Sequence, residues 1–147
     1  MGKRRKAREF ALQFLYSWDI AGGEPEEAIA LFGDFTGEGE LMPPYARDLI
    51  RATIEKKDEL DGLIARYCAN WDLERIAVVD RNILRLALCE MLHGKDVPPI
   101  VVINEAVDIA KKYSTVESGG FVNGILDRIR TDLLSEKGGG AKEKEGG

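Results

Sequence analysis

Basic side chains gather at the start of the chain, where the first eight residues hold five of the 21 lysines and arginines and no acidic residue. Such a cluster can neutralise nucleic-acid phosphates, which releases counterions and makes binding depend on salt. The rest of the chain holds 16 basic and all 26 acidic side chains, and the whole chain has a net charge of −5. A basic pole on an acidic body suits an anionic ligand at one place and a basic protein partner at another.

A second candidate site lies near the other end, where Gly119 and Gly120 precede Phe121. We expect the last helix to begin here, with Phe121 one position into it. Open backbone N–H groups at a helix N-terminus bind anions, and an aromatic ring can stack on an unpaired RNA base. The alternative is that the two glycines are ordinary turn residues and Phe121 is a partly buried core residue.

The sequence offers little for catalysis. It has a single histidine, His93, and two isolated cysteines, Cys68 and Cys89, without the spacing of metal ligands. It has no phosphate-binding loop, dinucleotide fingerprint or nucleophile elbow. We therefore expect no enzymatic activity, no metal and no cofactor, and we expect both cysteines to be buried thiols in a reducing compartment. Because neither an apolar leader nor a long apolar run is present, we expect a cytoplasmic protein.

Helical spacing of apolar residues dominates the chain of 147 residues, of which 44% are hydrophobic and 32% charged. No strand pattern is found. The sequence predicts an all-α fold of about seven helices, in a single domain over residues 1–135, followed by a disordered tail, 136–147, rich in Gly, Lys and Glu. Between residues 43 and 67 we expect two helices, or one kinked helix, with Asp58 as the N-cap of the second. After a break at Gly94 and Pro98-Pro99, we expect another helix over residues 102–113.

The first helix, expected over residues 3–18, carries two lines of side chains. The first line is a core-facing stripe of Ala7, Phe10, Ala11, Phe14, Leu15 and Trp18. The second line follows the flank and consists of Arg5, Arg8, Leu12, Tyr16 and Asp19. It is either a solvated edge with two stray apolar residues or a contact strip for a partner.

Glu90 is a carboxylate within an apolar stripe. It shares one face of the helix expected over residues 77–92 with Val79, Ile83 and Ala87. A buried carboxylate must be paired or must accept hydrogen bonds. We therefore expect Glu90 to be buried and bonded to backbone N–H groups near a helix start, or to a nearby arginine or lysine.

Four blocks of sequence stand in order between residues 3 and 130. They are Arg4-Arg5-Lys6-Ala7-Arg8-Glu9 with Ala11-Leu12-Gln13 and Leu15-Tyr16; Val79-Asp80-Arg81-Asn82-Ile83-Leu84-Arg85-Leu86-Ala87 with Glu90; Ile103-Asn104-Glu105-Ala106 with Ala110-Lys111 and Tyr113-Ser114; and Phe121-Val122-Asn123-Gly124-Ile125-Leu126-Asp127. In this combination they resemble the NusB family of bacterial transcription antitermination factors. The resemblance implies two small helical bundles packed side by side, without catalytic activity. It also implies binding of the boxA element of ribosomal-RNA leaders together with NusE, a small-subunit ribosomal protein, and through it the RNA polymerase antitermination complex. Such a factor promotes processive transcription of ribosomal-RNA operons.

Site residues follow from this resemblance together with the residue patterns above. The expected RNA-binding residues are Arg4, Arg5, Arg8, Glu117, Ser118, Gly120 and Phe121. The expected NusE-binding residues are Leu12, Tyr16, Glu74 and Asp80. The pair Gly119-Gly120 departs from the larger polar or basic residues often found before the phenylalanine, so we expect backbone-only phosphate contacts there.

Two other interpretations remain open. A domain of this kind also forms the N-terminal part of some ribosomal-RNA methyltransferases, although no methyltransferase segment follows in this sequence. Some family members form homodimers, so the chain could instead be mainly a dimer whose interface covers the RNA surface.

Overall fold

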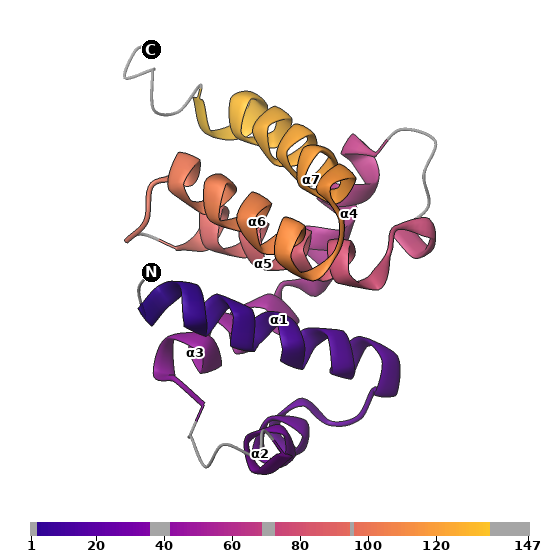
Figure 1. Ribbon diagram of the computed structural model, residues 1–147, viewed down its shortest axis with the longest axis vertical. Helices are drawn as coiled ribbons and strands as arrows, with labels where there is room; N and C mark the ends of the chain where they lie inside the picture. The colour runs from indigo at the N-terminus through magenta and orange to yellow at the C-terminus, as the bar shows by residue number, and fades with distance from the viewer. Residues whose placement is uncertain (1–2, 36–41, 69–72, 95, 136–147) are drawn as a thin grey trace.

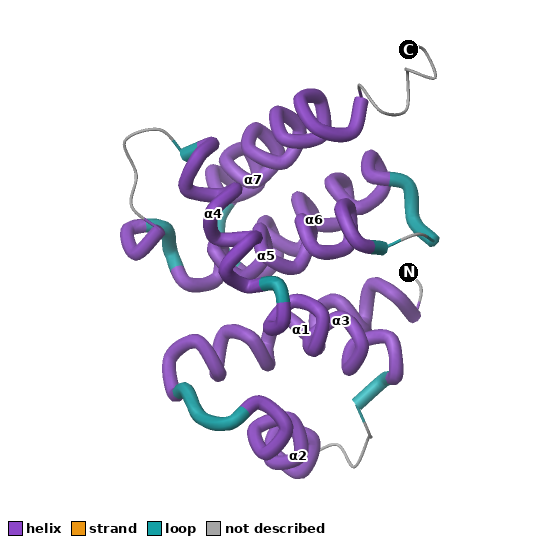
Figure 2. The backbone as a smooth tube through the Cα atoms, turned by 180° about the vertical axis from the view of Figure 1, so that it is seen from behind, coloured by secondary structure: helices purple, strands orange, loops and turns teal. Residues whose placement is uncertain are grey.

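The computed structural model describes residues 3–35, 42–68, 73–94 and 96–135, and the regular structure in these ranges is helical (Figure 1 and Figure 2). The α-helices are α1 (Lys3–Ala21), α2 (Pro25–Phe35), α3 (Pro44–Glu55), α4 (Lys57–Tyr67), α5 (Val78–His93), α6 (Pro99–Tyr113) and α7 (Val116–Ile129), with a 3₁₀ turn at Leu73–Arg75 and a π-helical turn at Arg130–Ser135. The predicted all-α fold is therefore confirmed for the described residues. The predicted tail, 136–147, lies outside them.

The helices form two bundles, α1 to α3 and α4 to α7, as Figure 1 shows. The helix α5 joins them, because it packs on α1 and α3 on one side and on α4, α6 and α7 on the other. Every residue from Asn82 to Met91 is buried. This matches the sequence, in which apolar residues cover more than one side of this helix, as is typical of a central helix.

The expected core stripe of α1 faces the inside of the first bundle. Ala7, Ala11, Phe14 and Leu15 are fully buried, while Phe10 and Trp18 are partly buried against the same core. The ring of Phe32 on α2 meets Phe10 and Phe14 edge to face, with centroid distances of 5.4 and 5.5 Å. Such aromatic pairs add about 0.5–1.5 kcal/mol each beyond the burial of their area.

Two of the predicted helix starts are wrong. Asp58 is not an N-cap, since α4 already begins at Lys57 and its N-cap residue, Lys56, makes no side-chain capping bond. Asp58 lies instead in the first turn, where a carboxylate is favourable beside the positive end of the helix dipole. The helix α6 begins at Pro99 rather than at Val102, because proline fits the first turn, where no N–H donor is required.

The start of α7 also differs from the prediction. Thr115 is the N-cap, and its Oγ1 accepts a hydrogen bond of 3.0 Å from the backbone N–H of Ser118. Gly119 and Gly120 therefore lie inside the helix, and the N–H of Gly119 donates to the carbonyl of Thr115 at 3.3 Å. The expectation of open amides at this glycine pair is thus wrong. A threonine cap outweighs the usual association of paired glycines with turns.

Candidate functional site

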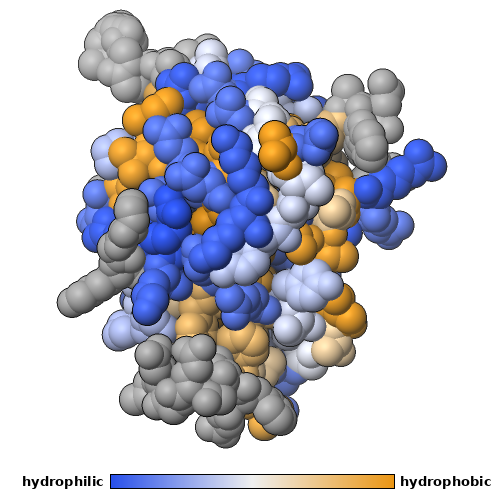
Figure 3. Space-filling model, viewed as in Figure 1, coloured by the Kyte–Doolittle hydropathy of each residue, from blue (hydrophilic) through white to orange (hydrophobic). Residues whose placement is uncertain are grey.

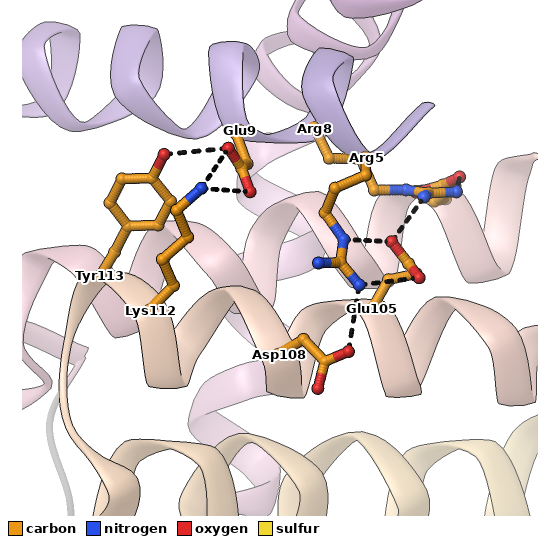
Figure 4. A network of polar contacts seen from close by, with 8 residues as sticks. Arg5, Arg8, Glu9, Glu105, Asp108, Lys112 and Tyr113 are labelled. Atoms are coloured by element: carbon orange, nitrogen blue, oxygen red, sulfur yellow. Dashed lines mark hydrogen bonds and ion pairs between the residues drawn. The ribbon is translucent and has the colours of Figure 1, made fainter. Parts of the chain in front are cut away.

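The helices α1 and α6 lie side by side and run in the same direction, and charged side chains join them along a polar seam (Figure 1 and Figure 4). We define this polar seam as Arg5 and Glu9 of α1 with Glu105, Asp108, Lys112 and Tyr113 of α6. On the face seen in Figure 3, hydrophilic residues gather over the middle of the molecule, where α1 lies beside α6. The predicted basic pole is therefore in direct contact with acidic side chains about 100 positions away.

Arg5 forms the most extensive contacts of the polar seam. Its Nε donates to Oε1 of Glu105 at 2.5 Å and its Nη2 donates to Oε2 at 3.0 Å, a two-pronged ion pair. The same Nη2 also donates to Oδ2 of Asp108 at 3.0 Å. The hydrogen bond from Arg5 lowers the pKa of Glu105 below its usual range, and the same bond raises the pKa of Arg5.

Arg8 points into the protein and is paired with Glu90, which is only 4% exposed. Its Nε donates to Oε1 at 2.8 Å and its Nη2 donates to Oε2 at 2.6 Å. The hydroxyl of Tyr45 on α3 also donates to Oε2 of Glu90, at 2.5 Å. Burial and this hydrogen bond raise the pKa of Tyr45 to about 12. The prediction that Glu90 is buried and paired with an arginine is confirmed.

Other basic side chains on α1 and α6 are more accessible. Arg4 is 45% exposed; it lies over the ring of Tyr45, 5.0 Å from the centroid, and 3.7 Å from a carboxylate oxygen of Asp96. Lys6 on α1 and Lys111 on α6 are exposed. Lys112 is also exposed, although it pairs with Glu9 at 3.0 Å. Together they leave a broken line of positive charge along α1 and α6.

The flanking line of α1 is mainly an internal surface, which differs from both of its predicted roles. Arg8 and Leu12 are buried. Asp19 accepts hydrogen bonds from Arg81 at 3.1 Å and Arg85 at 2.9 Å, both on α5. These contacts hold α1 on the second bundle, so the line is neither a solvated edge nor, over most of its length, a free contact strip.

Tyr16 is the exception on that line, because it is 41% exposed. It borders a groove of about 350 Å³ between α1, α2 and the second bundle. Leu12 lies in the same groove although its side chain is buried, and Phe32, Val79 and Tyr113 also line it. Glu74 is exposed in the 3₁₀ turn before α5. An amphipathic ring beside an apolar groove is a typical anchor point for a protein partner.

Asp80, a predicted NusE-binding residue, contacts Ser118, a predicted RNA-binding residue. Its side chain is buried, and its Oδ2 accepts a hydrogen bond of 2.9 Å from the hydroxyl of Ser118. Its Oδ1 is buried and has no hydrogen-bond partner among the described residues. Ser118 is buried as well and also contacts Thr115, so it organises the start of α7, whereas the neighbouring Glu117 is exposed.

The glycine pair and Phe121 lie on α7, on the far side of α6 from α1 (Figure 1). Gly119 is buried, and a Cβ atom there would lie 3.0 Å from Cγ of Lys111. Gly120 is exposed and has open space around it. Phe121 is half-buried and packs against the core at its edge. The structure thus does not place Phe121 directly beside the arginines of α1.

The described residues contain no group of three or more His, Cys, Asp or Glu side chains that could hold a metal ion. Cys68 and Cys89 are buried and not bonded to each other, as expected, and burial raises the pKa of both thiols. In the same part of the chain, no helix has both the length and the apolar character needed to cross a membrane.

The fold and the site define the class of this protein. It is an all-α domain of two small helical bundles that share a central buried helix, with a polar seam and a neighbouring apolar groove. The sequence matches the NusB family over residues 5–131. The chain belongs to this family, so the family assignment made from the four sequence blocks is confirmed.

Named relatives agree with this assignment. The transcription antitermination protein NusB of Desulforapulum autotrophicum is 47% identical over 132 residues, which cover 88% of this chain and 92% of the relative. The NusB protein of Geobacter sulfurreducens is 44% identical over 134 residues, with 90% and 97% covered.

Solved structures show the same fold. T. maritima NusB is 39% identical with a TM-score of 0.77, and the match covers 90% of this chain and 93% of that one. A crystal structure of the antitermination factors NusB and NusE in complex with double-stranded RNA contains a chain that is 31% identical, also with a TM-score of 0.77, with 88% and 97% covered.

Proposed function

We propose that this chain is a non-catalytic transcription antitermination factor that acts in the cytoplasm. It binds single-stranded boxA RNA of ribosomal-RNA leaders together with NusE, and so promotes processive transcription of ribosomal-RNA operons. The observation that carries the proposal is membership of the NusB family together with a solved relative in complex with NusE and RNA.

The RNA path in this proposal starts at α1 and crosses α6 to reach α7. Arg4 and Lys6 attract phosphates at the start, Lys111 and Lys112 continue the positive line over α6, and Phe121 stacks a base. What supports this path is that these lysines lie on the helix between the two predicted sites, with Lys111 directly beside Gly119 of α7.

The residues predicted to bind RNA take different parts in this proposal. Arg4 and the exposed part of Phe121 contact RNA directly, and the exposed Glu117 and Gly120 lie along its path. Arg8 and Ser118 are buried and support the site from inside the protein, since Arg8 is hydrogen-bonded to Glu90 and Ser118 to Asp80. Arg5 contacts a phosphate only by sharing its donors with, or releasing, an acidic partner.

NusE docks on the groove beside Tyr16 in this proposal. The Tyr16 ring and the apolar lining provide the anchor, while the exposed Glu74 attracts a basic protein. Oδ1 of Asp80, which has no partner among the described residues, accepts a hydrogen bond from NusE or from the start of α7 after that start rearranges on binding. Charge reversal at Glu74 should therefore weaken NusE binding without changing the circular dichroism spectrum.

The RNA proposal is tested by titrating boxA RNA over a salt series. Arg4→Ala should lower the slope of log affinity against log salt by about 0.7, the value for one phosphate contact on a single strand. Phe121→Ala should weaken binding by about 1–3 kcal/mol and leave the slope nearly intact, because stacking is not ionic.

Arg51→Ala is the matched control for Arg4→Ala. Arg51 is also about half exposed and ion-paired, with Glu26, but it lies on α3 away from the path. Equal salt slopes in wild type, Arg4→Ala and Arg51→Ala would refute the phosphate role of Arg4. Normal RNA binding by Phe121→Ala would mean that Phe121 has only a structural role.

A further inference from the structure

We propose that Asp108 competes with an RNA phosphate for Arg5, so that the protein carries its own carboxylate inhibitor within the RNA path. This inference rests on the proposed function, because it concerns the same RNA surface. Figure 4 shows the arrangement: Arg5 reaches from α1 toward α6, with Glu105 on one side and Asp108 next to it along α6.

The guanidinium of Arg5 has five N–H donors arranged as two forks that each match a carboxylate or phosphate, one made by Nη1 and Nη2 and the other made by Nε and Nη2. Glu105 takes one donor from each of these atoms, and Asp108 takes the other donor of Nη2. Carboxylate oxygens therefore occupy the Nε–Nη2 fork and one donor of the Nη1–Nη2 fork, so a phosphate can bind this second fork with two oxygens only if it displaces Asp108. The Arg5 side chain is only 20% exposed, and of its two acidic partners Asp108 is the more exposed, at 57% against 20% for Glu105.

Asp108 is the partner that RNA can displace. Its side chain is 57% exposed and makes one hydrogen bond to Arg5. Glu105 is 20% exposed, is bound twice by Arg5, and also lies 3.4 Å from Nη1 of Arg8. Release of Asp108 alone would leave Arg5 oriented by Glu105 while one Nη2 donor turns to the phosphate.

The contact between Arg5 and Asp108 should lower the affinity for RNA. In the free protein the exposed ion pair satisfies Arg5, and on binding the released carboxylate lies close to the phosphate and repels it. Both effects weaken RNA binding. Removing the charge of Asp108 should therefore tighten binding by about two- to fivefold, the range that corresponds to one exposed ion pair.

The experiment measures the affinity of a single-stranded boxA oligonucleotide for wild type and for Asp108→Asn, at low and at physiological salt. Glu26→Gln is the matched control, because it also removes one charge from an exposed ion pair, with Arg51, on the α2–α3 side of the protein. We expect a two- to fivefold gain for Asp108→Asn, clearly above that of Glu26→Gln. In a protein that already carries Arg5→Ala, the further change Asp108→Asn should raise the affinity for the oligonucleotide no more than Glu26→Gln does.

Two results would overturn the inference. An equal gain in Asp108→Asn and Glu26→Gln would mean that overall charge alone sets the affinity. A gain that persists without Arg5 would mean that Asp108 opposes RNA at some other group. If the wild-type protein does not bind the RNA at all, the proposed function itself fails, which the wild-type titration reports separately.

Discussion

At the scale of single residues, the buried carboxylate of Glu90 holds the two bundles together. It lies on α5 and accepts hydrogen bonds from Arg8 of α1 and Tyr45 of α3. Both carboxylate oxygens of Glu90 are paired, and Arg8 and Glu90 are buried away from water. Such a pair need not stabilise the fold more than apolar residues would, but removing one member leaves an uncompensated buried charge.

Glu90→Ala should therefore lower the free energy of unfolding by about 3–5 kcal/mol, because the buried Arg8 loses both of its short hydrogen bonds to Glu90 and keeps only the 3.4 Å contact with Glu105. Urea denaturation followed by circular dichroism measures this loss. Asp127→Asn provides the comparison, since it breaks an exposed pair with Arg130 and should cost at most about 1 kcal/mol. Equal losses in the two variants would show that burial of the Glu90 pair has no energetic effect.

Ionisation of Glu105 should make part of the free energy of unfolding depend on pH. The hydrogen bond from Arg5, opposed by partial burial, lowers the pKa of Glu105 in the folded state below that in the unfolded chain. The stabilisation is therefore complete above the ordinary carboxyl range and is lost as the pH falls through the lowered pKa. Urea unfolding from about pH 7 to about pH 3 should show a difference between wild type and Glu105→Gln that shrinks on acidification. A difference independent of pH would contradict this assignment.

At the scale of helices, the sequence predicted most elements but misplaced three starts. Apolar periodicity located α1, α5 and their buried faces correctly, because burial follows directly from side-chain spacing. The start of α7 was missed because the glycine pair resembles a turn, whereas Thr115 and Ser118 form the actual cap. The partners of Arg5 and Arg8 were not predictable from one sequence, since they depend on how α1 packs against helices about 80 to 100 positions away.

The glycine pair in α7 gives a test at this scale. Gly120→Ala should stabilise the protein by about 0.5–1 kcal/mol, because the position is helical, exposed and open. Gly119→Ala should gain less, since the new Cβ would lie 3.0 Å from Cγ of Lys111 and force that side chain to move. Thermal unfolding of the two variants compares them directly. A larger gain at Gly119 would mean that Lys111 yields without cost.

At the scale of the whole molecule, α5 makes the two bundles one cooperative unit. It is buried against helices of both bundles, and Asp19 of α1 adds further contacts with Arg81 and Arg85. Residues of α5 belong to the same buried core as those of both bundles, so we expect one unfolding transition. Circular dichroism and tryptophan fluorescence should give the same midpoint in urea. Separate midpoints would show that the bundles unfold independently.

The parallel course of α1 and α6 has a consequence for how fast an anion arrives. Both helices begin at the same end of the molecule, where Arg4 approaches Asp96 just before α6 (Figure 1). The positive ends of two helix dipoles therefore point to one side, and the first turn of α1 contains no acidic residue to offset them. This local field persists even though Arg5 and Arg8 are paired with carboxylates. An acidic protein can thus still draw a polyanion to this end at an increased association rate, an advantage that fades as salt screens the field.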